Sequence, residues 1–261
     1  TYLDTQQTDI DKLVANIRNP KWSRDVQERQ LELLRRLNRN HAGEREKEAA
    51  LEARIQAFEL AFRMQMEAQE AFDLSRETQA TLDAYGDTLH GRQLLLTRRL
   101  VERGVRFIQV WSGAGQPWDN HDNLEAQHRK LSGDWDRPIA AFLADLKQRG
   151  LLESTLVMWG GEFGRTTYSQ GQAGDAANGR DHHPRCFTYW MAGGGVKPGM
   201  TYGETDEVGY NVAKDPVHVH DFQATVMHLM GIDHERLTYK YQGRRFRLTD
   251  VHGDVVEEIV S

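Results

Sequence analysis

From residue 88 to the end of the chain, helical and extended patterns alternate. Helices are expected over residues 91–102, 124–149 and 217–230, and strands over residues 104–111, 156–159 and 187–192. Short apolar runs bounded by glycine are typical of buried strands, and a helix between two successive strands is typical of a crossover connection. The predicted fold class is therefore α/β, with a mainly parallel sheet.

The amino-terminal third of the chain has a different composition. Residues 9–85 are rich in Glu, Gln, Arg, Leu and Ala and contain no run of strand formers. Two apolar stripes have helical spacing; they consist of Val26, Leu31, Leu33, Leu34 and Leu37, and of Ile55, Phe58, Leu60, Ala61, Met64 and Met66. A start at Ser23, a break at 41–43 and a second turn at 72–75 predict an antiparallel helical hairpin. The predicted domains are a helical insert or arm, residues 1–86, and an incomplete α/β domain, residues 87–261.

Composition excludes several classes of protein. The 261 residues are enough to bury a core, and the net charge of −6 provides no basic field for a nucleic acid. No apolar stretch approaches the roughly 18 residues that a membrane-spanning helix needs, so no membrane span is expected. Cys186 is the only cysteine, which excludes internal disulfides and cysteine-based zinc sites.

Asp119 and His121 are the first candidate metal ligands. They lie two positions apart, so in an extended loop their side chains point the same way. A carboxylate oxygen and an imidazole nitrogen together can hold one divalent ion. The alternative is a polar loop in which Asp119 forms an Asx-turn.

Glu162 is the second candidate. It follows Gly160 and Gly161, which end the predicted strand over residues 156–159. An acidic group at a strand end needs a positive partner, because an unpaired charge in a partly buried place is costly. That partner is either a metal ion or Arg165, three residues further on.

The third candidate is the run from Arg180 to Pro184. Pro184 favours an extended conformation at His183, so His182 and His183 are expected to project to opposite sides. One of them would then bind a metal and the other would contact substrate or a second ion, while the planar fork of Arg180 suits a tetrahedral oxyanion. The alternative is a pair of exposed loop histidines.

Asp221, at the start of the helix expected over 217–230, is interpreted as a cap that pins this helix.

Several motifs resemble a sulfatase-like family of unknown function within the alkaline phosphatase superfamily. They cover residues 118–121, 159–165, 178–184, 192–197, 202–206 and 216–233. The resemblance implies a three-layer α/β/α, mainly parallel sheet and a two-metal site. Asp119 and His121 match one metal-binding pair, Glu162 matches a strand-end acid, and His182 or His183 matches a late histidine. Phe163 stands where many relatives carry histidine.

The activity that the resemblance implies is metal-dependent hydrolysis of a phosphate or sulfate ester. The cofactor would be a divalent metal, with Zn²⁺ expected and Mn²⁺ and Ca²⁺ as alternatives. Arg180 or Arg165 would neutralise charge on a small anionic substrate, and His183 would act as a catalytic group. Relatives of this kind are often exported, which implies an extracytoplasmic location.

The amino-terminal part that carries the nucleophile in such relatives is not recognisable here, so the chain is expected to be a piece of a longer protein. The alternative function is therefore a catalytically inactive binding or assembly module. In that case the charged helical hairpin would form a homo-oligomer or dock a partner.

Overall fold

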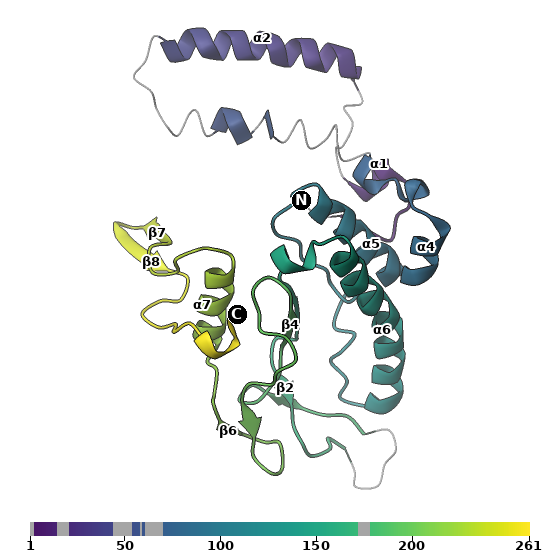
Figure 1. The fold of residues 1–261 in the computed structure, drawn as a ribbon, viewed down its shortest axis with the longest axis vertical. Helices are drawn as coiled ribbons and strands as arrows, with labels where there is room; N and C mark the ends of the chain where they lie inside the picture. The colour runs from purple at the N-terminus through teal and green to yellow at the C-terminus, as the bar shows by residue number, and fades with distance from the viewer. Residues whose placement is uncertain (1–2, 15–20, 44–53, 58, 61–69, 172–177) are drawn as a thin grey trace. The chain divides into compact units, whose positions relative to one another are not determined.

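A computed structural model describes residues 3–14, 21–43, 54–57, 59–60, 70–171 and 178–261. The proximity of Cα atoms divides the chain into two compact units, Thr1–Val110 and Trp111–Ser261. Figure 1 shows the elements of both units, coloured along the chain. The domains expected over residues 1–86 and 87–261 stay a prediction, because a division by proximity does not test which segment folds independently.

The described part of the first unit is helical. Its elements are the α-helices α1 (Ile10–Leu13), α2 (Arg24–Gly43), α4 (Gln79–Tyr85) and α5 (Leu89–Glu102), and the 3-10 helix η1 (Leu74–Arg76). The predicted helix start at Ser23 is confirmed, since α2 begins at the next residue. Arg35 of α2 forms an ion pair with Glu59 at 2.9 Å. The second arm of the predicted hairpin lies largely outside the described residues.

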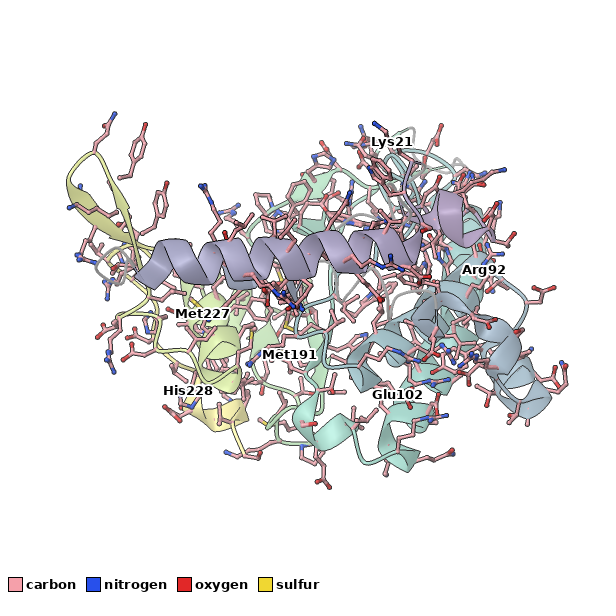
Figure 2. All side chains as sticks on the ribbon, turned by 90° about the horizontal axis from the view of Figure 1, so that it is seen from above. Lys21, Arg92, Glu102, Met191, Met227 and His228 are labelled. Atoms are coloured by element: carbon pink, nitrogen blue, oxygen red, sulfur yellow. The ribbon has the colours of Figure 1, made fainter. Side chains whose placement is uncertain are left out.

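The side chains of α5 form much of the buried part of this unit. Leu95 is 2% exposed, and Arg98 on the same helix is equally buried. The guanidinium of Arg98 donates to Glu77 at 2.5 Å and to Glu102, labelled in Figure 2, at 2.6 Å. An unpaired charge inside the protein is costly, so these carboxylates make the burial of Arg98 tolerable and fix α5 against the segment that contains Glu77.

The second unit contains one long helix, α6 (Leu124–Gln148). The helix continues without a break through Gly133 and through Pro138. Pro138 removes one backbone hydrogen bond, but its ring is part of the buried stripe. This stripe, at the three- and four-residue spacing of a helix face, consists of Trp135, Pro138, Phe142 and Leu146.

The remaining elements of this unit are short. The strands are β1 (Val157–Trp159), β2 (Gly164–Arg165), β3 (His182–His183), β4 (Trp190–Ala192), β5 (Glu204–Thr205), β6 (Val212–Lys214), β7 (Thr238–Tyr241) and β8 (Arg244–Arg247). The helices are η2 (Leu152–Ser154), α7 (Val219–Leu229) and η3 (Glu257–Ile259). The strands pair as β1 with β4, β2 with β3, β5 with β6 and β7 with β8. All four pairs are antiparallel.

The predicted α/β fold, a three-layer α/β/α arrangement with a mainly parallel sheet, is therefore wrong. The described residues form mixed helices and short two-stranded antiparallel sheets. Two of the expected strands exist as β1 and β4, but they run in opposite directions. The chain between them makes the β2–β3 pair and contains no described helix that could serve as a crossover. The strand expected over 104–111 is absent from the described structure of that segment.

All three expected helices are confirmed: α5, α6 and α7 lie within two residues of the predicted limits. None of the helices in the described part of the chain has both the length and the apolar character needed to cross a membrane.

Candidate metal centre

Three chain segments that are distant in sequence deliver the side chains of this site. Asp119 and His121 lie in the loop before α6, Arg165 is in β2, and His182 is in β3. Arg165 and His182 are direct partners in the β2–β3 register. Directly opposed residues of an antiparallel pair project to the same face, so both side chains reach the same carboxylate.

That carboxylate belongs to Asp119, and its Oδ1 atom is the centre of the cluster. The Nε2 atoms of His182 and His121 lie 2.9 Å and 3.1 Å from it. Nη1 of Arg165 donates a hydrogen bond to the same oxygen. Within the described chain, Asp119, His121 and His182 form the one group of three metal-ligand type whose ligand atoms all lie within 4.8 Å of one another.

Neighbouring groups orient the two imidazoles. Nδ1 of His121 lies 2.6 Å from Oε1 of Gln170, a distance that suits a hydrogen bond from the ring to the amide oxygen. This bond leaves Nε2 of His121 directed at Asp119, as an outer partner does for a metal-binding histidine. The ring of His182 packs between His121 and Phe163, with centroid distances of 5.0 Å and 4.7 Å.

The loop that carries Asp119 is anchored by tryptophans. The hydroxyl oxygen of Ser112 accepts hydrogen bonds from the indole nitrogens of Trp118 at 2.7 Å and of Trp135 at 2.6 Å. The ring of Trp118 also meets the edge of Trp159 in β1. Ser112 thus has a structural role, and Asp119 follows directly after a fixed side chain.

Gly179 allows the two parts of the site to approach each other. A Cβ atom at this position would lie 1.9 Å from the backbone carbon of His121 and 2.1 Å from its oxygen. The backbone of Arg180 donates to the carbonyl of Asn120 at 3.2 Å, so the contact continues beyond Gly179. Only glycine permits this spacing, and the spacing holds His121 near His182.

The surroundings of Asp119 lower the pKa of its carboxyl group from 3.8 to about 2. The hydrogen bond with His182 is the largest cause, and the hydrogen bond with Arg165 is the next. The ionised form is thus favoured across the physiological range, as a metal ligand requires.

This depressed pKa predicts how the carboxylate contributes to stability as pH changes. The stabilisation by the ionised Asp119 carboxylate is complete above its unfolded-state pKa, near 3.8. It is lost as pH falls through its folded-state pKa of about 2. We expect a carbon-detected NMR titration to give a midpoint near 2 for Asp119 in the wild type, and a midpoint closer to 3.8 in Arg165→Ala. A wild-type midpoint at the ordinary value would contradict the hydrogen-bond network described above.

The structure does not bring the other candidate residues into the cluster. The side chain of Glu162 is 68% exposed, and its carboxylate lies 3.9 Å from Arg165. His183 projects away, is buried at 4% exposure, and stacks on Tyr210 with ring centroids 4.2 Å apart. Nη1 of Arg180 donates to the backbone carbonyl of Thr166 at 2.9 Å.

Sequence reasoning missed Gln170 and Gly179. Gln170 is 49 residues from His121 and carries no local signal of its role. Gly179 lies in the predicted loop beside Arg180, but a close backbone approach is visible only when the opposite segment is known.

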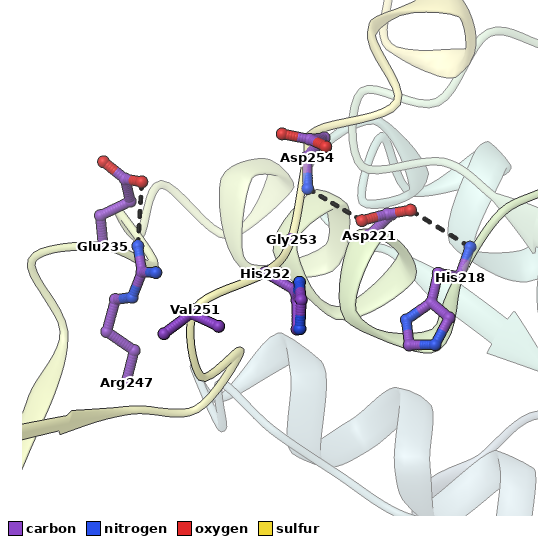
Figure 3. A pocket seen from close by; sticks show the side chains of 8 residues that line it. All are labelled: His218, Asp221, Glu235, Arg247, Val251, His252, Gly253 and Asp254. Carbon is purple, nitrogen blue, oxygen red and sulfur yellow. Dashed lines mark hydrogen bonds and ion pairs between the residues drawn. The ribbon is translucent and has the colours of Figure 1, made fainter.

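A second group of polar residues lines a hollow of about 430 Å³ near the start of α7 (Figure 3). One oxygen of Asp221 accepts from the backbone nitrogen of His218 at 3.2 Å, and the other accepts from that of Asp254 at 2.9 Å. The interpretation of Asp221 as a residue that pins the helix is thereby confirmed, because its carboxylate completes a capping box.

Comparison with known proteins identifies one family. A family model described as "Protein of unknown function (DUF1501)" matches residues 2–260. No curated protein and no solved structure matches the chain. The resemblance to a sulfatase-like family of the alkaline phosphatase superfamily is therefore wrong, since the matched family has no assigned function and nothing in these comparisons indicates a sulfatase or an alkaline phosphatase.

Proposed function

Since the chain belongs to the DUF1501 family, whose function is unknown, we propose a function from its own site: metal-dependent hydrolysis of a small phosphate or sulfate ester. The observation that carries the proposal is the convergence of Asp119, His121 and His182. Two imidazoles and one carboxylate form a ligand set typical of catalytic zinc sites, in which water or substrate completes the coordination.

The spacing of the ligand atoms fits such an ion. Two ligands on a tetrahedral zinc ion are roughly 3.4 Å apart, as follows from bond lengths of about 2.1 Å. The distances from Oδ1 of Asp119 to the two Nε2 atoms, 2.9 Å and 3.1 Å, differ from this by a few tenths of an ångström. Imidazole ligands favour Zn²⁺ over the oxygen-preferring Ca²⁺, and Mn²⁺ is the other candidate.

Exposure and charge support a small anionic substrate. His121 and His182 are 39% and 44% exposed, so a molecule from solvent can reach the ligand atoms. Arg165 lies against the same carboxylate, and its second nitrogen, Nη2, is 3.9 Å from exposed Glu162. A guanidinium in this place can hold two oxygens of an ester anion.

A metal ion in the site would supply a polarised ester oxygen and an activated water molecule. The chain's own residues would do the rest. Gln170 would hold the ring of His121 in position, and Phe163 would restrict the ring of His182. Arg165 would bind and orient the anion, and would oppose the negative charge that develops during hydrolysis.

One observation favours the second candidate, an inactive binding module. The hydrogen bond from Arg165 to Asp119 already neutralises the carboxylate, as a purely structural ion pair would. In this case the cluster would hold the loop before α6 against the β2–β3 pair, and the partner or second copy would bind elsewhere, for example on the amino-terminal helices.

A turnover assay separates the two candidates. We expect the protein to hydrolyse nitrophenyl phosphate or nitrophenyl sulfate after addition of Zn²⁺ or Mn²⁺, and a chelator to abolish turnover. His182→Ala should lower the rate by at least about a hundredfold, because it removes a ligand. His183→Ala is the matched control, since this neighbouring histidine faces away from the cluster. Metal binding without turnover of either ester would support the inactive module.

A further inference from the structure

The segment from Leu237 to Leu248 is strongly basic and aromatic. It contains Lys240, Arg244, Arg245 and Arg247 and no acidic residue, in a chain whose net charge is −6. Arg247 is ion-paired with Glu235, just before the segment, at 2.9 Å, so the other three cations carry the local positive charge. Tyr239, Tyr241 and Phe246 alternate with these cations. A local charge of this sign in an acidic protein points to an anionic partner for this one segment.

The segment forms the β7–β8 hairpin, which extends beyond α7 in Figure 1. Gln242 and Gly243, which connect the strands, have φ angles of 46° and 82°. Positive φ angles at both turn positions are typical of the tight turns that join antiparallel strands. Among the described residues, the two strands pair only with each other.

The register gives the hairpin two different faces. Tyr239 lies opposite Phe246, and Tyr241 lies opposite Arg244. Lys240 lies opposite Arg245, and this pair occupies the other face. Like charges that face each other across a strand pair are destabilising, so an anion between Lys240 and Arg245 would relieve their repulsion.

The hairpin buries neither face well. On one face Tyr239 is 68% exposed and Tyr241 is 56% exposed, and on the other face Lys240 and Arg245 are exposed as well. A sheet packed on a core would hide one of its faces. Isolated two-stranded hairpins are marginally stable in water. Contact with a surface that takes up the aromatic rings would therefore stabilise the hairpin.

Aliphatic residues at the base of the hairpin decide between the classes of anionic partner. Leu248 and Val251 are 73% and 67% exposed. A single-stranded nucleic acid would use the cations and the aromatic rings but would leave these aliphatic side chains in water. The interface of a lipid bilayer accommodates all three kinds of side chain if the hairpin enters it edge-on. The aromatic rings of one face and the cations of the other then both lie in the headgroup layer, and the aliphatic groups lie beside the acyl chains. A second copy of the hairpin is disfavoured, because it would bring like charges together.

We propose that the β7–β8 hairpin, together with Leu248 and Val251, is a peripheral binding surface for anionic lipid bilayers. This surface does not depend on the metal centre or on its chemistry. It would hold the protein at an anionic membrane through contacts that do not span the bilayer.

Sedimentation with vesicles tests this with the complete wild-type chain. We expect retention by phosphatidylcholine vesicles that contain about 30% phosphatidylglycerol, weak retention by phosphatidylcholine alone, and loss of binding as salt rises. Equal retention by both kinds of vesicle, or by neither, would overturn the proposal without reliance on any variant.

Two double variants locate the surface. Lys240→Glu with Arg245→Glu should weaken binding to anionic vesicles at least about 25-fold, since each lost cation near the surface accounts for about fivefold. Tyr239→Ser with Tyr241→Ser should weaken binding to these vesicles at least about tenfold, because the variant lacks two aromatic rings whose transfer from water to the bilayer favours binding. Arg129→Glu with Lys130→Glu, on exposed positions of α6, makes the same charge change and should alter binding by less than about threefold.

The remaining outcomes also decide the matter. Thermal unfolding of each variant shows whether it is folded, and hairpin variants that are folded and still bind like the wild type would overturn the proposal. Oligothymidylate binding that needs the same residues, in the absence of vesicle binding, would assign the hairpin to nucleic acid. A dimer in light scattering that these substitutions dissociate, again without vesicle binding, would assign it to self-association.

Discussion

Asp119→Ala is expected to lower the affinity for Zn²⁺ by at least about a hundredfold, more than loss of an outer partner of a metal ligand usually does. Asp119 provides the one carboxylate of the triad, and its Oδ1 atom is the point on which both imidazoles converge. Calorimetric titration of chelator-treated protein with Zn²⁺ measures the change directly. Asp119→Asn should show the same loss, since it keeps the shape of the side chain and removes the charge.

Two further variants act as matched controls. Asp122 lies in the same loop, is exposed, and is not part of the triad, so Asp122→Ala should bind Zn²⁺ within about threefold of the wild type. Glu162→Ala should behave similarly, because its carboxylate points to solvent and Arg165. A loss of affinity in Glu162→Ala as large as in Asp119→Ala would show that the ion lies closer to Glu162 than proposed. An unchanged affinity in Asp119→Ala would refute the metal centre.

Gly179→Ala is expected to reduce Zn²⁺ affinity about tenfold to a hundredfold although it removes no ligand. The added methyl group would lie 1.9 Å from the backbone carbon of His121 and 2.4 Å from the nitrogen of Asp122. Both are backbone atoms, so no side-chain rotation relieves the clash and the loop that carries His121 has to move. Overpacking of this kind also lowers the free energy of unfolding by about 1–3 kcal/mol.

Gly133→Ala makes the same chemical change but is expected to stabilise the protein, whereas Gly179→Ala is expected to destabilise it. Gly133 lies inside α6, and a Cβ atom there would meet nothing within 4 Å. This variant should raise the free energy of unfolding by about 0.5–1 kcal/mol, because alanine is the better helix former. Its Zn²⁺ affinity should not change. Denaturant unfolding and the same calorimetric titration check both variants, and equal affinities in the two would show that the Gly179 contact does not position His121.

The limits of several helices could be predicted from the sequence because helical signals are local. The start of α2 after Ser23 and the limits of α6 and α7 follow from capping residues and apolar spacing. The direction of strand pairing could not be predicted in this way. It depends on where distant segments meet. β1 and β4 are antiparallel, although the alternation of helical and extended patterns along the sequence predicted a parallel sheet.

The candidate site shows the same division. The side chains of Asp119 and His121 were expected to act together because they are two residues apart, and they do lie together in the structure. The choice between His182 and His183 depended on the register of β2 and β3, since a slip of one residue would exchange their faces. The register is set by contacts between the two strands, and these contacts cannot be predicted from the local sequence.

The sequence by itself thus determined which chemical groups are present, which helices form and which neighbouring ligands can point the same way. The tertiary structure alone decided that Arg165 and His182 converge on Asp119, that Glu162 remains in solvent and that Gly179 touches the backbone of His121. The reason is physical: propensities and periodicity act over a few residues, whereas the approach of distant segments is set by the packing of the whole unit.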